Sequence, residues 1–255
     1  MIDIHSHIIP NIDDGSKDID MTLEMLTLAS KSGTKKIIAT PHYFKGYWTP
    51  HYKDIIGKIK ELNELVKKHN INIEVYPAQE IYFYDNMAEE FIEGKIGTIN
   101  GSKYMLIEFP MDSFDNNIFE VLYELQIRGI VPIIAHPERY RTFIKHPNEI
   151  NKFIEEGYLF QLNGSSVTGI FGKDVKKTAE IFLANGIYSF IGSDAHTTGK
   201  RNTYLNDALE VIDRIKPGEE KKFKDNGIRL LNNDNIEFNG KKIEKKKGIF
   251  SFLKI

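Results

Sequence analysis

The sequence predicts an α/β fold in which about seven parallel strands close into a barrel. Three observations predict it: short strand-like runs alternate with longer helical patterns, several runs are apolar throughout, and no linker divides the series. Strands buried on both faces read as continuous apolar runs, and repeated strand–helix units give parallel strands with right-handed crossovers. A doubly wound open sheet is the alternative, because periodicity does not decide closure. We expect a single domain over residues 1–255.

The predicted strands are short and rich in Ile, Val, Tyr and Phe, which suit a buried, pleated sheet. In chain order they cover Met1–His5, Lys36–Thr40, Ile73–Pro77, Tyr104–Phe109, Val131–Ala135, Leu159–Leu162 and Tyr188–Ile191.

The predicted helices lie between these strands and carry apolar residues three and four positions apart. They cover Asp18–Ser32, Tyr52–His69, Asp115–Arg128, Pro147–Glu156 and Lys173–Asn185. Glycine just past the last turn is a common helix end signal, and four of the five patterns have one, at Gly33, Gly129, Gly157 and Gly186.

The composition excludes several classes of function. The net charge of -2 gives no electrostatic case for a nucleic-acid binder. The absence of cysteine excludes disulfides, thiolate metal sites and cysteine nucleophiles. No run reaches the roughly 18–20 apolar residues of a transmembrane helix, and no signal-peptide pattern opens the chain. We therefore expect a cytoplasmic protein without a transmembrane segment.

The lysine-rich end, residues 240–255 ("GKKIEKKKGIFSFLKI"), combines basic residues with an apolar cluster. We expect it to pack its Ile, Phe and Leu side chains on the core. The alternative is contact with an anionic surface or a partner.

Polar side chains gather where the predicted strands end. Because the carboxyl ends of barrel strands meet at one mouth, we expect these side chains to converge there. They include five of the eight histidines; His51, His69 and His146 lie elsewhere. One polar strand end is ordinary, but repetition on every strand predicts a shared site. Its members are His5, His7, His42, Glu80, Glu108, His136, Asn163, Asp194 and His196.

Imidazole and carboxylate ligands without thiolate suit Zn, Mn, Fe or Co. The ligands outnumber the needs of one ion, so we expect more than one, bridged by a carboxylate such as Glu80. Clustered ions lower the pKa of bound water and clamp phosphoryl oxygens. Arg139 and Arg201 flank the predicted mouth, and guanidinium forks match phosphate oxygens. Arg141 is the less favoured alternative to Arg139.

The motifs "DIHSH", "TPH", "AHPER" and "GSDAH", with a glutamate after the third strand, resemble the polymerase and histidinol phosphatase (PHP) superfamily. The longer stretches "DIHSHIIPNIDDGS", "YPAQEIY", "FQLNGSSVTG" and "IGSDAHTTGKR" resemble one branch more closely. That branch is the bacterial manganese-dependent protein tyrosine phosphatases linked to capsular and extracellular polysaccharide synthesis. The resemblance spans roughly residues 1–235 and implies a distorted (β/α)7 barrel holding three divalent ions, preferably Mn²⁺, with Fe, Zn or Co as alternatives.

The resemblance also implies which residues hold each ion. The first ion would take His5, His7, Glu80 and Asp194; the second Glu80, Glu108 and His136; the third Asp14, His42 and His196. Asp13 either shapes the turn or supports a ligand from behind.

The implied reaction is hydrolysis of phosphotyrosine by metal-activated water. The implied substrate is a phosphotyrosine-containing protein, the C-terminal tail of a bacterial tyrosine kinase. Arg139 and Arg201 would stabilise the phosphoryl charge, and His42, Asp194, His196 or a water would protonate the leaving oxygen. The aromatic loop Tyr43–Tyr52 would either form a rim that stacks the substrate ring or pack as a lid over the barrel.

Two other functions fit the same residues. One is a PHP-type phosphatase of a small ester such as histidinol phosphate; the balanced charge weighs against a nucleic-acid phosphodiester. The other is a catalytically silent metal-binding scaffold that regulates a kinase by contact.

Overall fold

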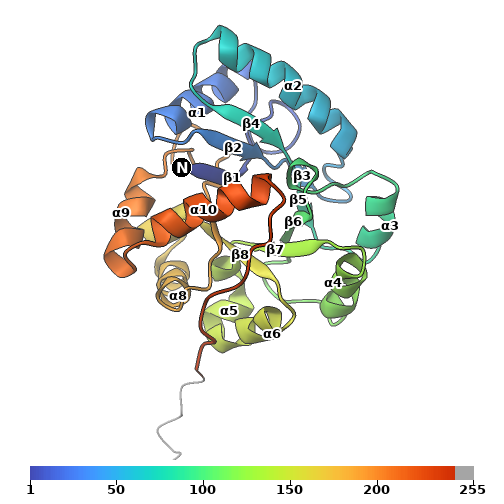
Figure 1. Ribbon diagram of the computed structural model, residues 1–255, viewed down its shortest axis with the longest axis vertical. Coiled ribbons are helices and arrows are strands. Elements are labelled where there is room, and N and C mark those ends of the chain that lie inside the picture. Colours follow the sequence, from blue (N-terminus) through green and yellow to red (C-terminus); the bar gives the residue numbers. More distant parts are fainter. Residues whose placement is uncertain (245–255) are drawn as a thin grey trace, which may run out of the picture.

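The computed structural model of the chain describes residues 1–244 as strands that alternate with helices (Figure 1). The strands are β1 (Ile2–Ser6), β2 (Lys36–Ala39), β3 (His42–Tyr43), β4 (Glu74–Pro77), β5 (Glu80–Tyr82), β6 (Tyr104–Glu108), β7 (Val131–Ala135), β8 (Leu159–Asn163) and β9 (Phe190–Gly192). The helices are α1 (Ile19–Lys31), α2 (Tyr52–Lys68), α3 (Met87–Ile92), α4 (Ile118–Gln126), α5 (Arg141–Lys145), α6 (Ile150–Glu155), α7 (Gly164–Thr168), α8 (Lys173–Ala184), α9 (Asn206–Ile215) and α10 (Glu219–Leu231), with short 3₁₀ turns η1 (Ile99–Gly101), η2 (Pro137–Arg139) and η3 (Pro147–Glu149).

All the strand pairs are parallel, and they form two sheets with the orders β1-β2-β4 and β3-β5-β6-β7-β8-β9. The sheets meet again between β1 and β9, where an isolated bridge joins Ser6 to Ala195 and the His7 amide donates to the Ala195 carbonyl at 2.9 Å. The predicted distorted parallel barrel is therefore confirmed.

The two sheets arise because the chain breaks just after the second and third predicted strands and then resumes each time as a second short strand. Pro41 separates β2 from β3, and Pro77 ends β4 before β5 begins at Glu80. Proline cannot donate a ladder hydrogen bond, which weakens pairing at both positions. The second segment of each broken strand continues into the other sheet, with His42 in register with Glu80.

All five predicted helices are present, but α4 is shorter than predicted and the Pro147–Glu156 pattern begins as the turn η3 before α6. The prediction contained no helix after the last strand, whereas α9 and α10 lie there. Gly227 in the middle of α10 argues against a helix by propensity. A Cβ at Gly227 would meet the Ile2 side chain at 2.9 Å, so this glycine lets α10 lie against β1.

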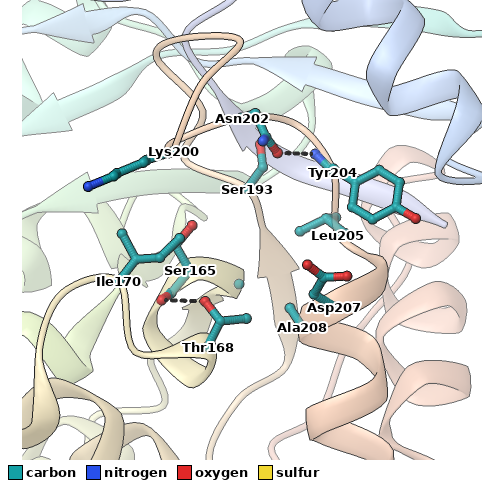
Figure 2. A pocket seen from close by; sticks show the side chains of 11 residues that line it. Ser165, Thr168, Ile170, Ser193, Lys200, Asn202, Tyr204, Leu205, Asp207 and Ala208 are labelled. Atoms are coloured by element: carbon teal, nitrogen blue, oxygen red, sulfur yellow. Dashed lines mark hydrogen bonds between the residues drawn. The ribbon is translucent and has the colours of Figure 1, made fainter.

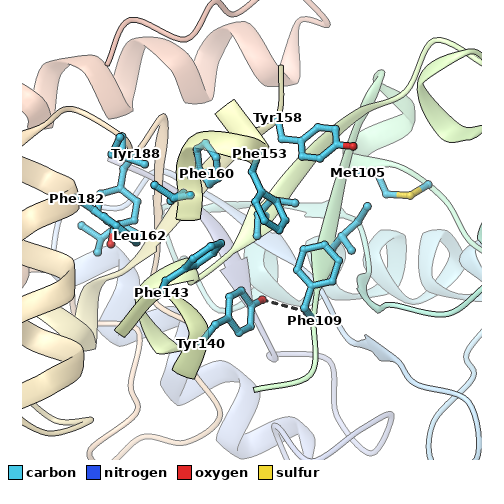
Figure 3. Packing of buried hydrophobic residues seen from close by; sticks show 14 of the residues in the cluster. Met105, Phe109, Tyr140, Phe143, Phe153, Tyr158, Phe160, Leu162, Phe182 and Tyr188 are labelled. Carbon is cyan, nitrogen blue, oxygen red and sulfur yellow. Dashed lines mark hydrogen bonds between the residues drawn. The ribbon is translucent and has the colours of Figure 1, made fainter. Parts of the chain in front are cut away.

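The largest buried cluster combines aliphatic side chains with a group of aromatic rings that includes Phe109, Tyr140, Phe143 and Phe153 (Figure 3). Phe143 and Phe153 meet edge to face, with ring centroids 5.3 Å apart. The Tyr140 hydroxyl accepts from the Phe109 amide at 3.0 Å and donates to the Ala135 carbonyl at 2.9 Å. These bonds fix the chain that leaves β7, which carries two of the predicted site residues.

The predicted tail is described only up to Glu244. Ile243 exchanges two backbone hydrogen bonds with the Asn151 side chain at 2.8 and 2.9 Å, and Lys242 pairs with Glu155 at 2.7 Å. The packing predicted for Ile249–Leu253 lies outside the described residues. Over residues 1–244, no helix has both the length and the apolar character that a bilayer crossing requires.

Candidate metal centre

β1 delivers the first two predicted ligands into the barrel mouth. Side chains two positions apart on an extended strand share a face, and the Nε2 atoms of His5 and His7 lie 3.2 Å apart. Both rings are completely buried. The loop after them returns close to His7, because a Cβ at Gly15 would meet the His7 carbonyl oxygen at 2.2 Å. Only glycine permits that approach.

Glu80 lies at the centre of the cluster. Its Oε2 is 3.1 Å from His5 Nε2, 3.2 Å from His7 Nε2 and 3.1 Å from His42 Nδ1. Its Oε1 is 3.0 Å from His136 Nε2. Burial alone would raise the pKa of Glu80, but the surrounding histidines outweigh it and hold that pKa well below its usual range. Glu80 is therefore ionised and lies within reach of four histidine rings.

Two further carboxylates extend the cluster on either side of His42. Asp14 Oδ1 is 3.6 Å from His42 Nε2 and 3.3 Å from His196 Nε2, and its side chain is 46% exposed. Glu108 lies deeper, with Oε1 3.5 Å from His136 Nε2 and Oε2 3.8 Å from His42 Nδ1. The Asp14 side of the cluster therefore faces the mouth.

The nine predicted ligands all converge. The set predicted for the first ion forms one group of ligand atoms within 4.8 Å of one another. A second group contains the whole set predicted for the third ion together with His7. A third group joins His42, Glu80 and Glu108, which differs from the set predicted for the second ion by His42 in place of His136. His136 nevertheless faces both glutamates.

The donor chemistry fits divalent cations. Gln161 Oε1 accepts from His5 Nδ1 at 3.0 Å, Asp13 Oδ2 accepts from His7 Nδ1 at 2.8 Å, and the Asp194 carbonyl accepts from His196 Nδ1 at 3.0 Å. In each of the three rings the Nε2 lone pair is thereby aimed into the cluster, as metal-binding histidines require.

The Nε2 lone pairs of His5 and His7 face each other at 3.2 Å and repel unless a cation lies between them. His42 Nδ1 is buried and has no hydrogen-bond partner in the described part of the chain, although Glu80 is close. Burial lowers the pKa of both His42 and His136 to about 4, so these rings are neutral at pH 7 and can donate a lone pair.

Asp194 follows β9 and binds both predicted arginines. Arg139 Nη1 donates to Asp194 Oδ2 and Arg201 Nη2 donates to Asp194 Oδ1, each at 2.9 Å. Asn163 Nδ2 donates to Oδ2 at 2.6 Å. The Phe171 ring lies 4.6 Å from the Arg139 guanidinium carbon and 5.7 Å from that of Arg201. The guanidinium groups of Arg139 and Arg201 are therefore held close to each other at the mouth.

Arg141, the less favoured alternative, points elsewhere. It is 67% exposed and pairs with Asp112 at 3.0 Å.

Two of the predicted ligands occupy the left-handed region of backbone conformation, which non-glycine residues rarely adopt. His136 has φ 30° and Asp194 has φ 50°. His136 directly follows β7, and Asp194 is the second residue after β9. The strained turn at each position redirects the side chain from the sheet into the mouth. Such strain is concentrated at functional sites.

Sequence reasoning missed several residues that position the ligands. Gln161 Oε1 also accepts from the His136 amide at 3.3 Å, so one side chain orients two ligands. Asp3 Oδ1 accepts from the amides of His5 at 3.2 Å and Ser193 at 2.9 Å and ties β1 to β9. The available signal was polarity: Asp3 and Gln161 each stand between two apolar residues of their strand.

Asp13 makes contacts that fit both of its predicted roles, since it bonds its own turn and also the side of the His7 ring that points away from the cluster. Asp13 Oδ2 accepts from His7 Nδ1 at 2.8 Å and from the His42 amide at 3.0 Å, and Oδ1 accepts from the Gly15 amide at 2.9 Å. Both oxygens are acceptors only, so an amide in this place would turn an NH₂ group toward a donor.

We expect Asp13→Asn to weaken metal binding about 10- to 100-fold, because a lost hydrogen bond behind His7 frees its ring. Titration calorimetry with Mn²⁺ measures the affinity. Asp20→Asn, at an exposed aspartate of α1, is the matched control and should bind as the wild type does. Equal affinity in the Asp13 and Asp20 variants would contradict the role of Asp13.

An aromatic cluster of Phe44, Tyr47, Trp48 and Tyr82 lies beside His42. The Trp48 ring is stacked on the His42 ring with centroids 5.8 Å apart and an interplanar angle of 18°. Phe44 stacks on Tyr82 at 4.0 Å and contacts Tyr47 at 4.6 Å. Tyr47 is 71% exposed. A ring that open to solvent suits a rim beside the mouth better than a packed lid.

Comparison with known proteins identifies relatives along the whole chain. Residues 1–232 match the family described as capsular polysaccharide synthesis, CpsB/CapC. The tyrosine-protein phosphatase YwqE of Bacillus subtilis is 34% identical over 255 residues, covering 99% of this chain and 100% of YwqE. The tyrosine-protein phosphatase CpsB of Streptococcus agalactiae serotype III is 31% identical over 249 residues, covering 92% of this chain and 100% of CpsB.

A solved structure agrees with this result. It comes from crystal structures of YwqE from Bacillus subtilis and CpsB from Streptococcus pneumoniae, which are described as unique metal-dependent tyrosine phosphatases. It superposes with a TM-score of 0.91 at 32% identity and covers 96% of this chain and 100% of that one. The resemblance found in the sequence motifs is therefore confirmed.

Proposed function

The chain belongs to the CpsB/CapC family of capsular polysaccharide synthesis, and on this premise we propose that it is a metal-dependent protein tyrosine phosphatase. The observation that carries the proposal is the convergence of five histidines and four carboxylates on one mouth, next to two arginine forks. This constellation supplies ligands for cations and donors for phosphate in one place.

We assign three divalent ions to the cluster, with Mn²⁺ as the preferred metal. His5, His7, Glu80 and Asp194 would hold the first; Glu80, Glu108 and His136 the second; Asp14, His42 and His196 the third. The contacts of Glu80 with four histidine rings support its bridging role. When bound, such ions lower the pKa of water and neutralise phosphoryl oxygens.

Arg139 and Arg201 would bind the phosphoryl group. Each guanidinium places one Nη on Asp194, which leaves other N–H donors of the fork for phosphate oxygens. Phe171 restricts both forks by contact with their faces. The arginines would therefore meet the substrate already oriented, so that little ordering is required when charge develops on the equatorial oxygens.

The leaving phenolate needs only weak protonation as it departs, since the pKa of the phenol is about 10. Asp194 is poorly suited to give a proton. Burial alone would raise its pKa, but His7 and His5, followed by Arg201 and Arg139, outweigh burial and hold that pKa well below the usual range. His42 and His196 face the more open side of the cluster, next to Asp14. Burial lowers the pKa of both rings, and both are assigned to the third ion, so neither is a good proton donor. We therefore assign protonation of the leaving oxygen to a water.

The proposed substrate is a bacterial tyrosine kinase phosphorylated on its C-terminal tail. We place the reaction in the cytoplasm, where tyrosine kinases find ATP. The aromatic rim of Phe44, Tyr47, Trp48 and Tyr82 supports an aromatic substrate, because a phenyl ring can stack beside Trp48 while the phosphate reaches the cluster.

We expect Trp48→Ala to reduce the preference for phosphotyrosine over phosphoserine peptides about two- to tenfold, the typical energy of one aromatic pair. The ratio of kcat/KM for matched peptides measures it. Tyr123→Ala removes an aromatic ring that is 58% exposed on α4 and serves as the control. An unchanged ratio in the Trp48 variant would show that the rim does not contact the substrate ring.

The proposed function is tested by Mn²⁺-dependent turnover of a phosphotyrosine peptide and of histidinol phosphate by the same preparation. We expect the peptide to have the higher kcat/KM. Faster turnover of histidinol phosphate would favour the small-ester phosphatase instead.

The scaffold alternative predicts bound metal with no hydrolysis of any phosphate monoester. Elemental analysis together with nitrophenyl phosphate hydrolysis, with and without chelator, separates it from an enzyme. We expect chelator-sensitive hydrolysis.

A further inference from the structure

A cavity of about 300 Å³ lies between α7 and α9 beside the end of β9 (Figure 2). Lys200 and Ile170 line one side, Leu205, Asp207 and Ala208 line the other, and Ser165 and Thr168 lie between the two sides (Figure 2). Its volume is at the lower end of the range found for ligand pockets. None of these residues belongs to the metal cluster.

The cavity adjoins the proposed phosphate site through the chain itself. Lys200 and Asn202, which line it, are the two neighbours of Arg201 in sequence. Ser193, another lining residue, directly precedes Asp194, and Ile170 directly precedes Phe171. Consecutive Cα atoms are 3.8 Å apart. A polypeptide with its phosphotyrosine at the arginines could therefore place a residue one or two positions away in this cavity.

The lining suits a peptide side chain. Ile170 is 47% exposed and offers an apolar wall together with the side chains of Leu205 and Ala208. The loop that carries Lys200 is braced, because Asn202 Oδ1 accepts from the Tyr204 amide at 2.8 Å and Asn202 Nδ2 donates to the Gly199 carbonyl at 2.6 Å. Lys200 is thus presented from a defined turn.

Lys200 supplies the charge at this edge of the mouth. Arg139 and Arg201 are both paired with Asp194, whereas no carboxylate of residues 1–244 lies within ion-pair distance of Lys200. Asp207 is on the opposite side of the cavity, in the first turn of α9, where the helix dipole stabilises its charge. An acidic side chain would therefore be attracted to the Lys200 end.

We propose that this cavity is a recognition subsite for the polypeptide next to the phosphotyrosine and that Lys200 selects an acidic residue there. The proposal rests on the proposed phosphatase function and adds a preference within its substrates. A small phosphate ester has no flanking residues, so the subsite would distinguish a protein substrate from it.

The test uses phosphotyrosine peptides that differ only by Glu, Gln or Lys at positions one and two on either side. We measure kcat/KM for each peptide with the metal-loaded wild type and with Lys200→Glu. We expect the wild type to favour Glu over Lys about fivefold on one side of the phosphotyrosine, as an exposed ion pair allows. Lys200→Glu should abolish or reverse this ratio. Raising the salt concentration should reduce the wild-type ratio.

Lys60→Glu is the matched control, since it makes the same charge change at an exposed position of α2. We expect it to keep the wild-type ratio. Equal kcat/KM for Glu and Lys peptides in the wild type, or equal shifts in the Lys60 and Lys200 variants, would overturn the subsite while leaving the phosphatase function intact. No hydrolysis of any phosphotyrosine peptide would overturn both.

Discussion

Glu80→Gln is expected to remove bound metal and to lower phosphotyrosine hydrolysis by about 10³-fold or more, which corresponds to about 4 kcal/mol of transition-state stabilisation. The glutamine has nearly the same shape but no charge. It would leave the lone pairs of His5, His7 and His42 facing a neutral amide where a carboxylate now lies at 3.1–3.2 Å. The affinity of the whole cluster should fall, because Glu80 contacts ligands of every proposed ion.

Elemental analysis and initial rates on one preparation measure both effects. Glu89→Gln, at an exposed glutamate of α3, is the control and should match the wild type. Circular dichroism confirms that each variant is folded. A Glu80 variant with wild-type metal content and activity would show that the cluster is not the catalytic centre.

Replacing either Arg139 or Arg201 should have the second largest effect. Unlike the Glu80 change, it should lower the rate of hydrolysis without removing metal. We expect Arg139→Ala and Arg201→Ala each to lower kcat by about 10²–10³-fold, the usual effect of removing one donor to developing charge. Metal content should be retained, since neither arginine is a ligand. Arg139→Lys should recover only part of the rate, because an ammonium lacks the planar fork.

Arg141→Ala is a close control for Arg139, since it removes an arginine two residues away that pairs with Asp112 outside the mouth. It should keep wild-type kcat and metal content. Loss of metal in the Arg139 variant, or an equal loss of rate in the Arg141 variant, would contradict a phosphate-binding role.

Much of the site could be predicted from sequence because parallel topology makes strand ends converge. His5 and His7, "TPH", "AHPER" and "GSDAH" each follow a strongly apolar run, so their places on the barrel follow from the pattern alone. The ligand types then predict the chemistry. The prediction that Glu80 lies at the mouth is correct, but Glu80 begins β5 after a proline break and does not end the third strand.

The residues behind the ligands could not be predicted in the same way. Gln161 reaches His5 across 156 positions of sequence, and Asp3 reaches the Ser193 amide across 190. Such bonds depend on register and on the strained turns at His136 and Asp194, which no local pattern encodes. Gly227 in α10 likewise reflects contact with β1, which is a property of the folded barrel.

A metal titration of chelator-treated protein tests the central claim most directly. Mn²⁺ is added in steps, and hydrolysis of a phosphotyrosine peptide is recorded against the number of ions bound per chain. We predict no hydrolysis without metal and a rise that saturates when the three proposed positions are filled. Full hydrolysis by the metal-free protein, or saturated metal binding without hydrolysis, would contradict the assignment of this cluster as the catalytic centre.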